Sequence, residues 1–328
     1  MYFQDQMKQM KNHSNFENYI SQEFIKVSKL HSVYYEIHGN PNGDPVFIIH
    51  GGPGGGSSYV LKKLFNLDIF KLIFIDQRGC GKSQPFLQLK ENTTQDLVED
   101  IEKIRKHLNI DKITLFGGSW GTTLSLAYSI KYPENVKRIL LRAVFLGRQE
   151  DIDFLYEENG ASDYYPDVFD EYKNFVKNLP GKNILHKYYN IFKGERNNFQ
   201  EEAAKIFSNW ESSLVSIKKF KPKKRLSKEE INSNLAISLF ETHYFVNNCF
   251  FQSDNYLLEN AKVISNIPTF IVHGRQDIDC RPIGAYLLHK SLINSKLFLI
   301  DGASHTSLEK NMWKTLKKII NEWENSEK

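Results

Sequence analysis

A serine lies at the centre of a short turn that joins a strand-like run to a helix-like run. Residues 117–121 read Gly-Gly-Ser-Trp-Gly; they follow the apolar run 113–116 and precede the helical pattern 122–131. In this setting the pattern G-x-S-x-G predicts a sharp, strained turn that lifts the Ser119 hydroxyl clear of a sheet. The outer glycines lack the Cβ atoms that would clash where strand and helix approach each other. The turn therefore predicts a serine nucleophile; the alternative is a glycine-rich turn that happens to hold a serine.

Strand-like runs alternate with helical patterns along most of the chain. The strand-like runs are 32–38, 45–50, 72–76, 113–116, 138–141, 269–273 and 296–300. One helical pattern carries an apolar stripe from Leu97 to Leu108, with Thr93 or Thr94 in place to cap it. This alternation predicts a mainly parallel, doubly wound sheet, and with the serine turn it predicts an α/β-hydrolase fold.

The alternation stops in the middle of the chain. Residues 147–261 are rich in Tyr, Phe, Asn and Lys and contain few strand-like runs, so we expect a helical cap over the carboxyl edge of the sheet. Two of its helical patterns are 199–214 and 228–245. The core is then expected to comprise 21–146 and 262–328, and the polar segment 1–20 to be flexible.

Bulk composition excludes several classes of protein. With 328 residues, 41% apolar residues and a net charge of +4, the chain is ordinary for a globular enzyme. The basic run 217–225 is expected to be a solvated loop rather than a nucleic-acid site. No apolar run is long enough for a signal peptide or a membrane span. Three cysteines without metal-ligand spacing favour a reducing, cytoplasmic setting, no metal and no cofactor.

The other members of a catalytic triad follow the serine in the order that this fold requires, first an acid and then a histidine. Asp277 follows the strand-like run 269–273, and His305 follows the last such run. The imidazole would take the proton of the serine hydroxyl, and the carboxylate would orient the imidazole. Asp279 and Asp301 are rival carboxylates for the acid. His50 and His273 end strands and are expected to be structural.

A glycine-rich loop supplies candidate donors for an oxyanion. The segment 50–56 reads His-Gly-Gly-Pro-Gly-Gly-Gly and resembles the H-G-G-G type of oxyanion loop. The N–H groups of Gly52 and Trp120 are the candidate donors, with Gly51 as a further one. A phosphate-cradling loop is the alternative, but the pattern G-x-x-x-x-G-K-[ST] is absent.

Several of these segments together resemble the proline iminopeptidases (prolyl aminopeptidases), serine peptidases of the α/β-hydrolase superfamily. The resemblance covers roughly residues 25–325. It rests on the segments 39–41, 50–54, 76–83, 117–121, 141–146, 210–211, 241–245, 274–280 and 302–305. It implies a hydrolase that cleaves an unblocked N-terminal proline from peptides, without metal or organic cofactor.

The resemblance also implies the residues that bind the substrate. In the family, the glutamates that match Glu211 and Glu241 hold the positively charged terminus, although either could be an ordinary helix-surface charge. Candidates for the walls of a proline-sized pocket are Phe145, Tyr244 and Phe245, with core aromatics as the alternative. Arg142 matches a family arginine near this subsite.

The chain departs from the family pattern at Thr242, where asparagine is expected, at Cys80 in place of serine and at Ala143 in place of glycine. These departures leave the expected reaction type intact. They leave open which N-terminal residues besides proline, such as alanine, are accepted. An esterase, amidase or acyltransferase on the same scaffold is the second interpretation, and a non-catalytic binding protein of this fold is the third. Oligomeric state and physiological role stay open.

Overall fold

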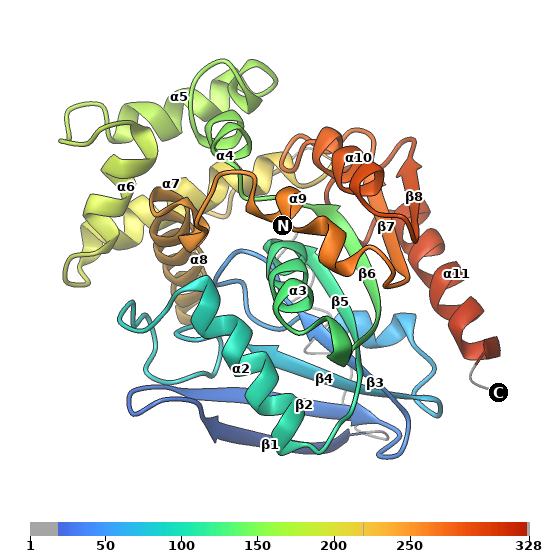
Figure 1. The fold of residues 1–328 in the computed structure, drawn as a ribbon. Coiled ribbons are helices and arrows are strands. Elements are labelled where there is room, and N and C mark those ends of the chain that lie inside the picture. Colours follow the sequence, from blue (N-terminus) through green and yellow to red (C-terminus); the bar gives the residue numbers. More distant parts are fainter. Residues whose placement is uncertain (1–18, 219, 327–328) are drawn as a thin grey trace.

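One eight-stranded sheet organises the molecule (Figure 1). The structure is a computed structural model that describes residues 19–218 and 220–326. The strands are β1 (Tyr19–Lys26), β2 (Ser32–Gly39), β3 (Asp44–Ile49), β4 (Phe70–Asp76), β5 (Ile113–Ser119), β6 (Val136–Val144), β7 (Thr269–Gly274) and β8 (Ser295–Ile300). Their order is β1-β2-β4-β3-β5-β6-β7-β8. The pairs β1/β2 and β2/β4 are antiparallel and the other pairs are parallel, which confirms the predicted mainly parallel sheet.

Helices cover both faces of this sheet. They are α2 (Thr94–His107), α3 (Trp120–Lys131), α4 (Gln149–Tyr156), α5 (Pro166–Phe175), α6 (Ile184–Phe192), α7 (Asn198–Leu214), α8 (Lys228–Val246), α9 (Tyr256–Glu259), α10 (Pro282–Ser291) and α11 (Lys310–Ser326). Because side chains alternate along a strand, Phe47 and Ile49 of β3 join the core under α2, α3 and α10. Val46 and Ile48 of the same strand join a second core under α11.

Local sequence fixes several of these elements. Thr93 caps α2 by accepting a hydrogen bond from the N–H of Asp96, whose side chain in turn accepts one from the N–H of Thr93. The sequence does not predict β1, because its apolar and polar residues do not alternate regularly. In this edge strand Phe24 is 56% exposed. Backbone pairing with β2, rather than burial, holds this strand in place.

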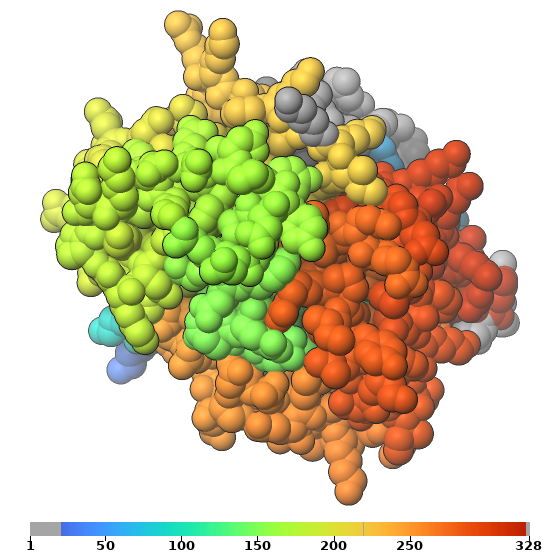
Figure 2. Space-filling view, turned by 90° about the horizontal axis from the view of Figure 1, so that it is seen from above, coloured from blue at the N-terminus to red at the C-terminus, as the bar shows by residue number. Residues whose placement is uncertain are grey.

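The helices α4–α8 come between β6 and β7 and lie beside the carboxyl edge of the sheet (Figure 1). The indole N–H of Trp210 donates to the carbonyl of Leu155 at 2.9 Å and so ties α7 to α4. Figure 2 shows the green part of this segment packed against the orange C-terminal part, where Arg281 donates to Asp151 at 2.6 Å. We propose that 147–261 forms the cap.

We propose that 21–146 and 262–328 form the core. Of the polar segment expected at 1–20, residues 1–18 lie outside the described residues, and β1 begins at Tyr19. No helix in the described ranges is long and apolar enough to cross a membrane.

Candidate active site

Ser119 ends β5 in the strained conformation that the sequence predicts. Its φ is 57° and its ψ is −128°, a region that residues other than glycine rarely occupy. The flanking glycines make this turn feasible, because a Cβ on Gly117 would lie 2.3 Å from the carbonyl oxygen of Gly121. A Cβ on Gly121 would lie 2.2 Å from the carbonyl oxygen of Ile49. The close packing of β5, α3 and β3 holds the serine in its strained geometry, with its side chain partly exposed.

The glycine-rich loop after β3 lies directly against this serine. A Cβ on Gly51 would lie 3.0 Å from the Cβ of Ser119 and 3.6 Å from its hydroxyl oxygen. Gly52 has a φ of +106°, and both glycines are partly exposed. Trp120 begins α3, so its N–H lacks a partner within the helix and carries part of the positive helix dipole. The loop and the helix terminus thus flank the serine, as an oxyanion hole requires.

His50 shapes this loop from within the protein, as the sequence predicts. Its imidazole Nδ1–H donates to the carbonyl of Gly51 at 2.8 Å, and its Nε2 accepts from the N–H of Gln77 at 3.0 Å. The side chain of Gln77 donates to the carbonyl of His50 and accepts from the indole N–H of Trp120 at 3.0 Å. Both ring nitrogens of His50 are therefore occupied in structural contacts.

His305 and Asp277 meet in the two loops where the sequence expects them. The Nδ1 atom of His305 lies 3.0 Å from Oδ2 and 3.3 Å from Oδ1 of Asp277. Asp277 also accepts from the N–H of Cys280 at 2.8 Å. Burial lowers the pKa of His305 to about 4, so the imidazole is neutral at pH 7 and able to take a proton. Burial raises the pKa of Asp277 to about 6 against the opposing effect of its polar neighbours.

Arg142 joins the serine turn to the histidine loop. It donates to the carbonyl of His305 at 2.8 Å, and a Cβ on Gly118 would lie 2.4 Å from its guanidinium. Within the described ranges the structure forms no hydrogen bond between Ser119 and His305, a contact that tightens in many hydrolases only with substrate bound. Since Nδ1 faces the carboxylates, Nε2 is the ring nitrogen left for the serine.

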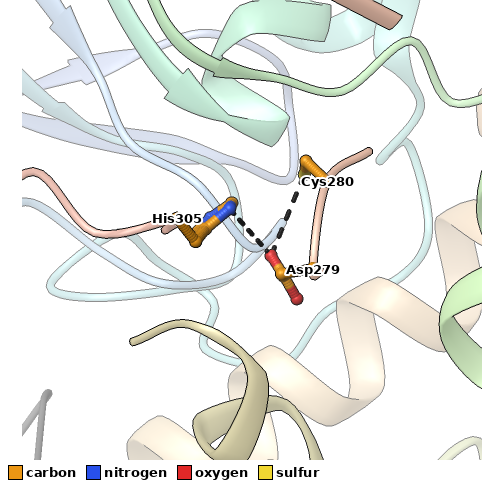
Figure 3. A group of neighbouring side chains, drawn as sticks. All are labelled: Asp279, Cys280 and His305. Carbon is orange, nitrogen blue, oxygen red and sulfur yellow. Dashed lines mark hydrogen bonds and ion pairs between the residues drawn. The ribbon is translucent and has the colours of Figure 1, made fainter. Parts of the chain in front are cut away.

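A second carboxylate also faces His305. Oδ2 of Asp279 lies 3.1 Å from Nδ1 of His305, and Figure 3 shows it beside Cys280 as well. The atoms of Asp279, Cys280 and His305 that could bind a metal ion lie within 4.8 Å of one another. No other group of His, Cys, Asp and Glu side chains in the described part of the chain offers such a set. Burial raises the pKa of the Cys280 thiol, which disfavours the thiolate that a metal would need.

Two glutamates from the cap helices approach each other above this site. Glu241 on α8 is buried, whereas Glu211 on α7 is partly exposed. The hydroxyl of Tyr156 lies 3.0 Å from Glu241 and 3.4 Å from Glu211. Burial, reinforced by the charge of Asp279, raises the pKa of Glu211 to about 8. Burial, together with the neighbouring charge of Glu211, also raises the pKa of Glu241 well above its usual value. We call Glu211, Glu241 and Asp279 the acidic cluster.

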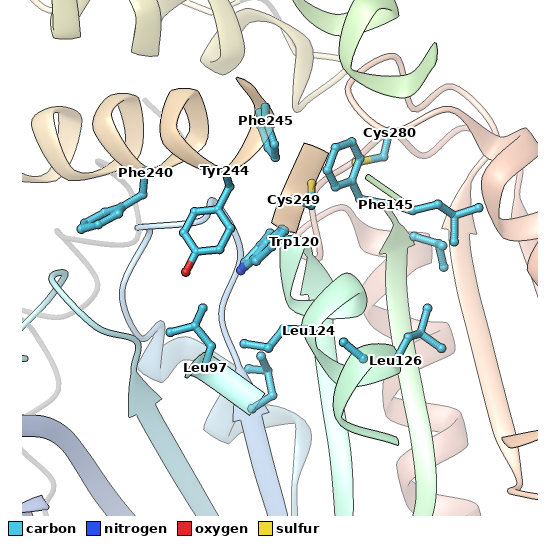
Figure 4. Packing of buried hydrophobic residues seen from close by; sticks show 14 of the residues in the cluster. Leu97, Trp120, Leu124, Leu126, Phe145, Phe240, Tyr244, Phe245, Cys249 and Cys280 are labelled. Carbon is cyan, nitrogen blue, oxygen red and sulfur yellow. The ribbon is translucent and has the colours of Figure 1, made fainter. Parts of the chain in front are cut away.

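The aromatic candidates separate into two groups. Phe245 packs on Phe145 with ring centroids 5.3 Å apart and on Tyr156 at 5.8 Å, beside the acidic cluster. Tyr244 instead packs on Trp120 at 4.8 Å and donates through its hydroxyl to Asn92. Figure 4 shows these two neighbours on α8 turned to different sides. Phe245 is turned toward Phe145 and Cys280, whereas Tyr244 is turned toward Trp120.

Two residues of the site are not identified by the sequence. Tyr156 is one of sixteen tyrosines in an aromatic-rich segment, and no local motif distinguishes it. Asp279 appears in the sequence only as a rival to Asp277. Its spacing of two residues within one loop was the available signal, because that loop brings both carboxylates to the same imidazole nitrogen.

The comparisons with known proteins agree with this architecture. A family model described as the alpha/beta hydrolase fold matches residues 44–311, so the chain is an α/β-hydrolase. An esterase from Exiguobacterium antarcticum superposes with a TM-score of 0.61 at 17% identity, covering 93% of this chain and all of that one. A proline iminopeptidase structure from Mycobacterium smegmatis gives a TM-score of 0.59 at 16% identity, covering 94% and 98%. At these identities the superpositions show the fold alone.

Curated sequence relatives narrow the class. The probable proline iminopeptidase of Leptolyngbya boryana is 42% identical over 87% of this chain and 88% of its own length. The proline iminopeptidases of Arabidopsis thaliana and of Neisseria meningitidis serogroup A are each 39% identical over 87% of this chain, and over 75% and 90% of their own lengths. The chain belongs to the proline iminopeptidase family.

Proposed function

We propose that this chain is a serine aminopeptidase that releases an unblocked N-terminal proline from peptides. The observation that carries the proposal is the pair of glutamates on the cap helices, Glu211 and Glu241, next to the triad loops. Two carboxyl groups in contact, one of them fully buried, are stable only if they hold a proton or face a cation. The ammonium group of a free N-terminus is a cation that lies one carbon atom from the first peptide carbonyl.

The triad and the oxyanion loop supply the chemistry in this proposal. Ser119 attacks the carbonyl carbon of the first residue while Nε2 of the neutral His305 takes the hydroxyl proton. Asp277 stabilises the imidazolium that forms, and the N–H groups of Gly52 and Trp120, with Gly51 adjacent, hold the oxyanion. His305 then protonates the leaving amine, and a water molecule activated by the same imidazole hydrolyses the acyl-enzyme.

The cap side would select the substrate. The incoming ammonium displaces protons held on Glu211 and Glu241 to the solvent and donates to both carboxylates, with the hydroxyl of Tyr156 fixing Glu241. Phe145 and Phe245 would pack against the apolar ring of the first residue. We do not expect Tyr244 to contact the ring directly, because it packs on the opposite side against Trp120. Arg142 would act by holding the loop of His305 in place.

We further propose a cytoplasmic location, supported by three cysteines that are buried and unpaired. Peptides with a free N-terminal proline would be its substrates.

Incubation of the protein with a short peptide that begins with proline, followed by mass spectrometry, tests the proposed activity. We expect the peptide to lose its first residue alone, and the Ser119→Ala protein to leave it intact. Cleavage at an internal bond, or release that survives Ser119→Ala, would contradict the proposal. Hydrolysis of simple esters without release of proline would support the esterase interpretation instead.

A further inference from the structure

Asp279 carries a buried oxygen that nothing in the described structure satisfies. The residue is only 4% exposed, and its Oδ1 is buried without a hydrogen-bond partner. Its Oδ2 lies 3.1 Å from His305 and 3.8 Å from the thiol of Cys280. Figure 3 shows one carboxylate oxygen turned toward these two side chains and the other turned away from both. A buried carboxylate oxygen without a donor costs folding free energy, so a ligand that donates to it is the natural explanation.

The position of Asp279 also points to a cation as that ligand. Asp279 touches the catalytic imidazole on one side, and its charge acts on Glu211 and on Tyr156 from the other. It therefore contacts the proposed catalytic base and lies near the glutamates proposed to hold the substrate amine. The amine and the scissile carbonyl share one carbon atom, so a group in this position is within reach of both.

Counting hydrogen-bond donors distinguishes two kinds of N-terminus. The ammonium of an N-terminal proline has two N–H bonds, because the ring carbon Cδ occupies the third substituent position. The ammonium of any other N-terminal residue has three N–H bonds. In a buried site each N–H needs its own acceptor. Tyr156 contacts one carboxylate oxygen of Glu211 and one of Glu241, which leaves one oxygen on each glutamate for the ammonium. A third N–H therefore requires an acceptor from another residue.

We propose that Oδ1 of Asp279 accepts the third N–H of a primary ammonium, so that the enzyme also cleaves small N-terminal residues such as alanine. This inference rests on the proposed aminopeptidase function and extends its substrate class. Asp279 is thereby a specificity-determining residue, because its hydrogen bond forms with primary amines and not with proline.

Steady-state kinetics of wild type and Asp279→Asn on three fluorogenic amides tests the proposal. The amides carry proline, alanine and cyclopentanecarboxylic acid, which has the size of proline but no amine. We expect wild type to cleave the alanine amide, and the substitution to lower kcat/KM for alanine about tenfold more than for proline, mainly through KM. Labelling by phenylmethanesulfonyl fluoride, which carries no amine, shows that the triad is folded. Any change in the labelling rate measures an effect of the substitution through His305, which is common to proline and alanine and cancels in their ratio.

Three results would overturn the inference. Wild type that cleaves proline but not alanine has no use for a third acceptor. An equal loss for proline, alanine and the sulfonyl fluoride would make Asp279 a positioning residue for His305. No loss with any substrate would make it structural.

The proposed aminopeptidase function, as distinct from the role of Asp279, would be contradicted if wild type cleaved none of the amine substrates.

Asp301→Asn is the matched control, because Asp301 lies in the loop before His305 but is largely exposed and paired with Arg275.

Discussion

The two sides of the site differ in how completely their polar groups are satisfied. On the sheet side, Asp277, His50 and His273 have protein partners for both polar side-chain atoms. Toward the cap, Glu211 and Glu241 of the acidic cluster share the single hydroxyl of Tyr156. The third member, Asp279 in the loop after β7, has an Oδ1 atom without a partner. The loops that carry Asp277, His50 and His273 have these contacts without substrate, whereas we propose that a cation completes the acidic cluster.

This difference has an energetic consequence. Preorganised groups on the sheet side need little rearrangement during the reaction, so they lower the barrier without an added cost at that moment. The acidic cluster should instead destabilise the free protein, and in the proposed function substrate binding relieves that cost. Substitutions on the sheet side should therefore affect catalysis alone, and substitutions in the acidic cluster should weaken substrate binding while stabilising the fold.

Ser119→Ala should produce the largest effect. Without the nucleophile we expect kcat/KM to fall on the order of 10⁴-fold or more, because no other group can form the acyl-enzyme. The thermal unfolding midpoint should not fall, since alanine removes one partly exposed hydroxyl. Initial rates at high enzyme concentration measure the loss. A near-normal rate in a preparation free of wild type would exclude Ser119 as the nucleophile.

Glu241→Gln and Glu211→Gln should lower kcat/KM for free-amine substrates by about 100-fold, chiefly through KM. Each replacement removes a charged acceptor for the ammonium but keeps the shape of the side chain. Both variants should unfold at a higher temperature than wild type, because each buried carboxyl group must take up a proton on folding at neutral pH and an amide need not. Kinetics and differential scanning calorimetry measure the two effects. Glu309→Gln, in the loop after His305, is a control outside the acidic cluster; lower stability of the cluster variants would contradict this account.

The pH dependence of stability should reveal the acidic cluster. Burial raises the pKa of Glu211 to about 8, so between pH 4.5 and 8 the folded protein holds a proton that the unfolded chain releases. The free energy of unfolding should therefore fall as the pH rises through this range, and Glu211→Gln should flatten the slope. His305 acts in the opposite direction below pH 6.5, since its pKa is lowered to about 4. Urea unfolding at several pH values between 6.5 and 8.5 isolates the first effect.

Cys280→Ser should have the smallest effect. We expect the activity of the variant to stay within about threefold of wild type. In the wild type Cys280 is 3% exposed and burial raises the pKa of its thiol, so it should react slowly with bulky thiol reagents. Modification of the wild type should block the site sterically, because Cys280 lies beside Asp279 and His305. Residual activity after treatment with a maleimide measures this. Full activity of a fully modified wild type would disprove the steric effect.

The sequence predicts the sheet side better than the cap side for a physical reason. Ser119 and its loop partners lie at the ends of strands, where parallel pairing brings distant segments to one edge. The cap has no such rule: the meeting of Tyr156, Glu211 and Glu241 depends on how α4, α7 and α8 pack. The resemblance to a family supplied the two glutamates, and nothing local in the sequence indicated the tyrosine.

Asp279 shows a further limit of prediction from sequence. Two carboxylates in one loop look like alternatives along the chain, but both reach the same imidazole nitrogen in space. The unsatisfied oxygen that gives Asp279 its proposed role depends on the positions of all surrounding donors, which no short motif encodes.

The most direct test of the central claim compares an amide of free proline with the same amide of N-acetylproline, in wild type and in Glu241→Gln. If the acidic cluster selects the free amine, wild type should cleave the free form far faster than the blocked one. Glu241→Gln should then lose most of that preference while keeping its rate of labelling by a serine phosphonate. Equal cleavage of both substrates by wild type, or an unchanged preference in the variant, would contradict the account.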